Sequence, residues 1–103
     1  MSNNKEITKY LGNAFSLQML DEFPTKINVV ECSQSEALAP GNKSVIGHPD
    51  TARVLGVNFN RVSVRLKKGD ILYVAQLVGG RLPEGCTILP EGFEFKFLKV
   101  TIV

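Results

Sequence analysis

The eight residues Ile-Leu-Tyr-Val-Ala-Gln-Leu-Val at 71–78 are apolar at nearly every position. A strand with one wet face alternates apolar and polar side chains, whereas a strand covered on both faces is apolar almost throughout. Residues 71–78 therefore predict a central strand in a sheet that is packed on both sides. Because 103 residues provide one hydrophobic core, the whole chain, 1–103, is expected to form a single domain, with residues 1–5 as a frayed tail.

Four further segments have the alternation or composition of strands, and they lie at 7–13, 25–32, 61–66 and 93–103. In 61–66, polar residues alternate with Val, Val and Leu, and the Lys-Lys-Gly-Asp that follows predicts a hairpin turn into 71–78. In 93–103, the apolar phase changes at Leu98, after three phenylalanines on one side. That change predicts either a bulge or burial on both faces of the strand.

The clearest helix signal covers residues 48–55. Pro49 suits the first helical position, where its missing N–H costs nothing, and Asp50 adds a favourable charge to the first turn. Gly56 is the expected stop.

A second helix is predicted at 16–23, with Ser16 as its N-cap and Pro24 as its end. Residues 33–43 have room for at most one helical turn before a Pro-Gly loop. The fold class predicted from these segments is a small mixed α/β domain. It has a mixed, roughly five-stranded sheet flanked by two or three short helices.

The charge balance is mild, with twelve Lys and Arg against ten Asp and Glu, a net charge of +2. This excludes a strongly basic surface for long duplex DNA, so no stable DNA binding is expected, but it suits a small anionic ligand in a local pocket. The N-terminus lacks an apolar signal region, and no apolar run approaches the ~20 residues of a membrane span. We expect a cytoplasmic protein without membrane contact, with Cys32 and Cys86 as reduced thiols.

The motifs of metal and nucleotide-cofactor sites are missing from the sequence. One histidine and scattered carboxylates form neither an HExxH pattern nor a carboxylate cluster, and there is no Walker loop, GxGxxG or GxSxG. The sequence therefore predicts no metal site and no cofactor.

The lone histidine, His48, falls at the N-cap of the helix predicted at 48–55. It has two interpretations, a structural cap or a group that faces an incoming phosphate, with Gly47 letting a ligand approach the backbone. A phosphate charge ~4 Å away is worth about 4 kcal/mol at an effective dielectric near 20, against about 0.3–1 kcal/mol for the helix dipole. A bound polyanion would therefore favour protonated His48 and make it a general acid.

The segment 79–92 contains Leu-Pro-Glu-Gly twice, at 82–85 and 89–92, with Arg81 before the first copy. Pro followed two residues later by Gly is ordinary turn chemistry, which favours two plain turns on local grounds.

Five blocks of the sequence, in this order and spacing, resemble the small viral and bacterial proteins that act as type III anti-CRISPR ring nucleases. The blocks are GNAFSLQML (12–20) with FPTKI (23–27), SVIGHPDTARVLG (44–56), NRVSVRL (60–66) and RLPEG (81–85). The resemblance covers residues from about 7 to the end of the chain. It implies a homodimer that binds cyclic tetra-adenylate across its interface and cleaves it to linear di-adenylates without a metal.

The resemblance also implies roles for single residues. His48 matches the general acid that protonates the departing 5′-oxygen after a ribose 2′-hydroxyl attacks the phosphate, Arg81 matches the arginine at the scissile phosphate, and Glu84 matches a loop carboxylate beside the site. The ligand-binding positions that it implies, stronger and weaker together, are Asn13, Ser16, Gly47, Asp50, Thr51, Arg61 and Gln76. For Ser16 and Asp50, a structural role at a helix start remains an equal or better explanation.

Two other functions remain open. A shortened segment, CTILPEG, stands where family members have a longer helical lid, so the protein could bind the ring without cutting it. A non-catalytic nucleic-acid-binding regulator would instead use Arg61, Arg65, Lys67 and Lys68 as a strip of phosphate contacts.

Overall fold

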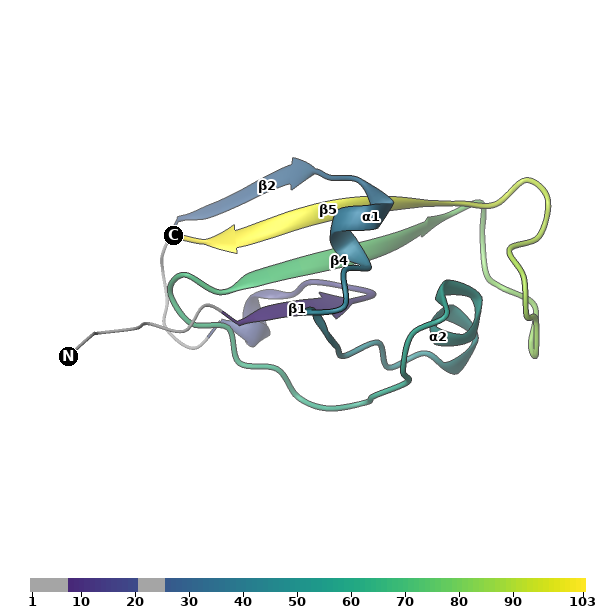
Figure 1. The fold of residues 1–103 in the computed structure, drawn as a ribbon, viewed down its shortest axis with the longest axis horizontal. Coiled ribbons are helices and arrows are strands. Elements are labelled where there is room, and N and C mark those ends of the chain that lie inside the picture. The colour runs from purple at the N-terminus through teal and green to yellow at the C-terminus, as the bar shows by residue number, and fades with distance from the viewer. Residues whose placement is uncertain (1–7, 21–25) are drawn as a thin grey trace.

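The chain folds around a five-stranded mixed sheet with strand order β2-β5-β4-β1-β3 (Figure 1). The computed structural model describes residues 8–20 and 26–103. The strands are β1 (Lys9–Gly12), β2 (Ile27–Glu31), β3 (Lys43–Ser44), β4 (Ile71–Val78) and β5 (Glu94–Ile102). A five-stranded mixed sheet with short helices is the fold class that the sequence predicted.

The strand β4 is central, as its apolar run predicts. It pairs in parallel with β1 on one side and antiparallel with β5 on the other. Four consecutive residues, from Leu72 to Ala75, are at most 6% exposed, so both faces of the strand are covered.

Two hydrophobic clusters cover the two faces of the sheet. On one face, Tyr73, Ala75 and Phe97 pack with Ala37 and Ala52 from the two α-helices. On the opposite face the cluster contains Leu20, Leu66, Leu72, Val74, Val100 and Ile102. The pairing of β5 with β4 runs without interruption from Ile71↔Thr101 to Val78↔Glu94. The change of phase at Leu98 therefore reflects burial on both faces, and the alternative of a bulge is wrong.

The helices are α1 (Gln34–Ala37), η1 (Leu17–Met19) and α2 (Pro49–Leu55). The single turn α1 and the helix α2, which begins with Pro49 and ends before Gly56, confirm the predictions for these segments. The helix predicted at 16–23 is wrong in type and extent. It is a 3-10 turn after Ser16, and Leu20 then forms a bridge to Leu66. Its predicted end at Pro24 lies outside the described residues.

The strand predicted at 61–66 is also wrong. Residues 61–66, all of them described, form no strand, because β1 and β5 occupy both edges of β4 and leave no edge for a hairpin partner. The turn itself does form, and the Asp70 N–H donates to the Lys67 carbonyl at 2.9 Å. The fifth strand is instead the two-residue β3, which is too short to show a periodicity.

A buried tyrosine ties α1 to the sheet. The Tyr73 hydroxyl donates to Glu36 Oε2 at 2.8 Å, and Lys99 Nζ lies 3.4 Å from the same oxygen. Burial, and next the bond to Glu36, raises the pKa of Tyr73 to about 12, while the hydrogen bond from Tyr73 lowers the pKa of Glu36. No helix in the described part of the chain is long and apolar enough to cross a membrane.

We expect the free energy of unfolding to fall as pH rises from 10 to about 12, because the unfolded chain releases the Tyr73 proton near 10 while the folded protein still holds it. One such proton accounts for a slope of up to about 1.4 kcal/mol per pH unit. Tyr73→Phe should remove this part of the slope, measured by urea unfolding at several pH values between 9 and 12. The same slope in both proteins would contradict the assignment.

Candidate functional site

Four of the ten predicted site residues come together where the parallel strands end. Because β1, β3 and β4 run in parallel, the segments that follow them meet at one edge of the sheet. Asn13 follows β1, His48 lies just beyond β3 at the start of α2, and Arg81 follows β4. Figure 1 shows α2 beside this edge.

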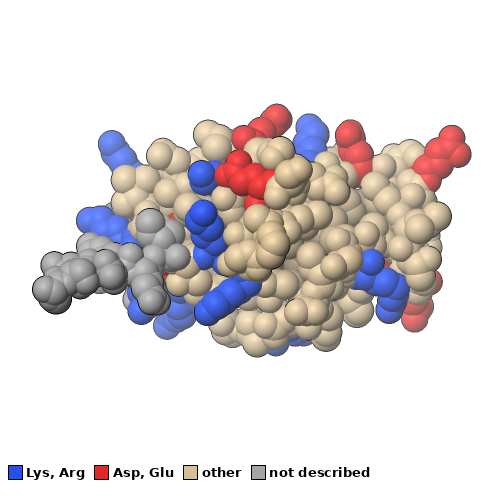
Figure 2. All heavy atoms as spheres, in the orientation of Figure 1, with Lys and Arg blue, Asp and Glu red and all other residues tan. Residues whose placement is uncertain are grey.

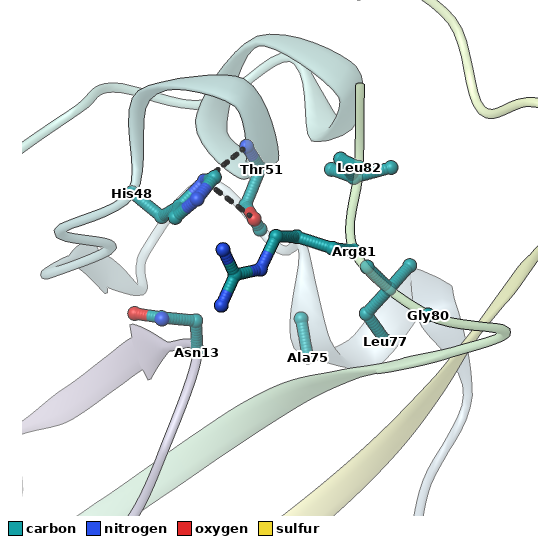
Figure 3. Close-up of a pocket in the computed structure, with 8 residues that line it drawn as sticks. All are labelled: Asn13, His48, Thr51, Ala75, Leu77, Gly80, Arg81 and Leu82. Carbon is teal, nitrogen blue, oxygen red and sulfur yellow. Dashed lines mark hydrogen bonds between the residues drawn. The ribbon is translucent and has the colours of Figure 1, made fainter. Parts of the chain in front are cut away.

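A cavity of about 530 Å³ opens there, which we call the His48 cavity (Figure 3). The residues that line it are Asn13, His48, Thr51, Ala75, Leu77, Gly80, Arg81 and Leu82. The Arg81 guanidinium points into the space between His48 and Asn13. None of the eight described lining residues is acidic, so the cavity favours an anion over a cation.

His48 caps α2 with its own side chain. Its Nδ1 accepts the Thr51 N–H at 3.3 Å, and the Thr51 hydroxyl lies 3.3 Å from the same nitrogen. Since Nδ1 accepts, the neutral ring carries its proton on Nε2. The structural interpretation of His48 is therefore confirmed, and it coexists with the placement of the ring on the cavity wall.

The segment before His48 is fixed from two sides. The Gly47 N–H donates to Asn13 Oδ1 at 3.4 Å, which joins the end of β1 to the start of α2. A Cβ on Gly47 would lie 3.2 Å from Arg61 Cγ. The close neighbour of Gly47 is thus the Arg61 side chain, where the sequence predicted room for a ligand.

The two Leu-Pro-Glu-Gly copies form the same turn. The N–H of Cys86 donates to the Pro83 carbonyl, and the N–H of Phe93 donates to the Pro90 carbonyl, both at 3.2 Å. Each turn has its glycine at a positive φ, 78° at Gly85 and 88° at Gly92, which a residue with a side chain rarely adopts. Local chemistry therefore makes the two copies alike.

Their attachments to the rest of the fold differ. In the first copy, Leu82 is 6% exposed and forms part of the cavity wall. The Gly85 N–H donates to Asp50 Oδ1 at 3.1 Å, and Arg53 Nη1 donates to that oxygen at 2.9 Å and to the Cys86 carbonyl at 3.4 Å. Among the described residues, the second copy has no such bond to a helix side chain.

The base of the loop at 79–92 is tightly closed. A Cβ on Gly79 would lie 2.8 Å from the Gly92 carbonyl oxygen and 3.1 Å from the Phe93 Cα. Only glycine permits this approach of the two chain segments, which lie just after β4 and just before β5.

Four other predicted residues are not among those that line the His48 cavity. Ser16 lines a second cavity of about 530 Å³, and Gln76 lines a third of about 350 Å³, both of which share Asn13 with the first. Gln76 faces the opposite side of the sheet from Ala75 and Leu77, because side chains alternate along β4. Arg61 and Glu84 are exposed and line none of these three cavities.

Sequence reasoning missed two contributors, Arg53 and Leu82. The spacing of Asp50 and Arg53, three residues apart on a helix, is a signal for their ion pair. Nothing local reveals that the pair also binds a loop, or that Leu82 is buried. In the described part of the chain, no group of three or more His, Cys, Asp and Glu is placed to hold a metal ion, and Cys32 and Cys86 are not bonded to each other.

Comparison with known proteins places the fold and the family. The structure is similar to that of B116 of Sulfolobus turreted icosahedral virus, with a TM-score of 0.74 over 91% of this chain and 98% of that one. The two sequences are 24% identical, so this likeness establishes the fold. No curated protein matches the chain. The family model described as STIV B116-like matches residues 9–97, most of the sequence, and the chain therefore belongs to the STIV B116-like family.

Proposed function

We propose that this protein is a metal-independent ring nuclease that binds cyclic tetra-adenylate between two copies of the chain and cleaves it to linear di-adenylates. Removal of this second messenger would switch off type III CRISPR signalling. The observation that carries the proposal is the meeting of His48 and Arg81, from separate segments, in one cavity without an acidic lining residue. The sequence resemblance to ring nucleases supplies the substrate.

In the proposed reaction, a ribose 2′-oxygen bonds to the adjacent phosphorus while the bond from phosphorus to the 5′-oxygen breaks. The 2′-hydroxyl proton leaves to water, and His48 gives a proton to the 5′-oxygen. The products are a 2′,3′-cyclic phosphate and a 5′-hydroxyl. Because Thr51 engages Nδ1, Nε2 is the atom that delivers the proton. Such transfer contributes about 10²–10⁴-fold, and Arg81 would donate to the charged phosphoryl oxygens.

Thr51 suits both protonation states of His48. A protonated ring carries a hydrogen on each nitrogen, so Nδ1 can no longer accept the Thr51 N–H. The Thr51 hydroxyl, also 3.3 Å from Nδ1, can accept the new Nδ1–H instead. Thr51 is 7% exposed, so water competes little for this hydroxyl, and the ring keeps a partner through the cycle.

The size of the cavity supports a dimer in this proposal. A volume of about 530 Å³ is that of a site for one small ligand, and a ring of four nucleotides is larger. Two copies related by a two-fold axis would present His48 and Arg81 to opposite linkages of the ring. Cleavage at both linkages then yields two di-adenylates.

Incubation with labelled cyclic tetra-adenylate in EDTA tests the reaction directly. We expect conversion to di-adenylates with 2′,3′-cyclic phosphate ends, resolved by chromatography. Activity that disappears only with EDTA would contradict the metal-free mechanism. Ring that stays bound and intact would identify a sponge for the nucleotide.

Two substitutions at His48 separate its role as the N-cap of α2 from its proposed role as general acid. His48→Ala should lower the free energy of unfolding by about 0.5–1 kcal/mol, whereas His48→Asn, with a good N-cap residue, should stay within a few tenths of wild type. Both should lose about 10²–10⁴-fold in cleavage, because neither supplies a proton. Urea unfolding and single-turnover cleavage measure the two effects. Cleavage by His48→Asn at the wild-type rate would contradict the catalytic role and leave His48 only its role as a helix cap.

The two Leu-Pro-Glu-Gly copies supply a matched pair of carboxylates. Glu84 and Glu91 are both exposed, each in the same turn. We expect Glu84→Ala to slow cleavage markedly and Glu91→Ala to cleave near the wild-type rate, since only the first copy is attached beside the cavity. Equal cleavage rates for the two variants would contradict a role for Glu84 in the site.

A second candidate function, nucleic-acid binding without catalysis, is favoured by exposed cations. Arg61, Arg65, Lys67 and Lys68 are all exposed along one segment. Figure 2 shows Lys and Arg side chains gathered mainly over the left half of this face. Tight binding to duplex DNA in a filter assay, with none to the ring, would favour this function over the ring nuclease.

A further inference from the structure

We propose that Asp50 is a positioning residue that holds the segment Arg81–Gly85 against α2, and so sets where Arg81 stands relative to His48. This inference rests on the proposed ring-nuclease function and extends it to the placement of its catalytic loop. Asp50 and Arg53 together, with their bonds to Gly85 and Cys86, are called the clasp below.

The clasp uses one carboxylate oxygen for two donors. Asp50 Oδ1 accepts from the Gly85 N–H at 3.1 Å and from Arg53 Nη1 at 2.9 Å. Arg53 Nη1 also reaches the Cys86 carbonyl at 3.4 Å, so the loop backbone is bound at two neighbouring residues. The Asp50 side chain is 14% exposed, although Arg53 remains 44% exposed. A carboxylate that served only the helix dipole would need no partner in the loop.

The loop has few other attachments beside the cavity. Pro83, Glu84 and Gly85 are exposed, whereas Leu82 is buried. The position of Arg81 therefore depends on the buried Leu82 and on the clasp at Gly85. Before Arg81, Gly79 and Gly80 have φ values of 121° and 125°. Because glycine has no side chain, neither residue adds a side-chain contact that would fix Arg81.

Helix α2 carries both parts of this arrangement. His48 caps its N-terminus and Asp50 lies in its first turn, so the clasp fixes the loop to the same turn that orients the imidazole. A displacement of about 1 Å between reacting groups can cost about 10²-fold in rate. Loss of the clasp should therefore act mainly on kcat.

Four variants test the clasp. Asp50→Ala removes the acceptor for both donors, Asp50→Asn keeps an oxygen for the Gly85 N–H, and Arg53→Ala leaves Asp50 without its cation. Glu91→Ala, an exposed carboxylate in the matching turn, is the control. Solvent exchange of the Gly85 N–H, followed by NMR, reports the clasp without reference to activity. Cleavage of cyclic tetra-adenylate gives kcat and KM, and thermal unfolding confirms that each variant is folded.

We expect Asp50→Ala to accelerate Gly85 exchange roughly tenfold and to lower kcat roughly tenfold or more, with a smaller change in KM. Asp50→Asn should restore much of the slow Gly85 exchange and much of kcat, and Glu91→Ala should match the wild-type protein in both measurements. Unchanged Gly85 exchange in Asp50→Ala would overturn the clasp. Faster exchange with unchanged kcat would overturn the positioning role. If the wild-type protein does not cleave the ring, the proposed function fails, and Gly85 exchange alone decides whether Asp50 holds the loop.

Discussion

The parallel pairing of β1 with β4 is the contact on which the arrangement of this protein depends. Two parallel neighbours cannot be joined by a tight turn, so the chain between them must cross over the sheet. The chain between β1 and β4 contains η1, β2, α1, β3 and α2, and the two α-helices cover the same face of the sheet. It also returns His48 to the edge at which β1 and β4 end, beside Asn13 and Arg81. One pairing thus supplies the helical layer and the site together.

The parts of the fold that could be predicted from sequence are those whose signal is local. The apolar run of β4 and the Pro49 and Gly56 boundaries of α2 depend on the residues themselves. The alternation at 61–66 is just as clear, yet a strand also needs a free neighbour, and β4 has none. Which edges are occupied depends on residues far along the chain, so alternation alone could not reveal it.

In the candidate site too, the features with a local signal could be predicted and those that depend on distant residues could not. The position of His48 at a helix start was visible in the sequence, and so was the arginine ahead of the first Leu-Pro-Glu-Gly copy. Whether Asp50 faces a ligand or a loop depended on where residues 85–86 lie, which no spacing encodes. Gln76 lies on the opposite face of β4 from Ala75, and this placement follows from the strand period once the sheet is known.

The closed base of the loop at Gly79 separates the length of the loop from the geometry of the sheet. Because Gly79 lies against the backbone of Gly92 and Phe93, the register of β4 and β5 is fixed before the loop begins. The entropy of closing a loop grows slowly, by about 0.6 kcal/mol for each doubling of its length. Residues 87–91, beyond the clasp, are therefore the stretch where insertions or deletions cost the fold least. Evolution can lengthen or trim the loop there while the sheet and the first turn stay in place.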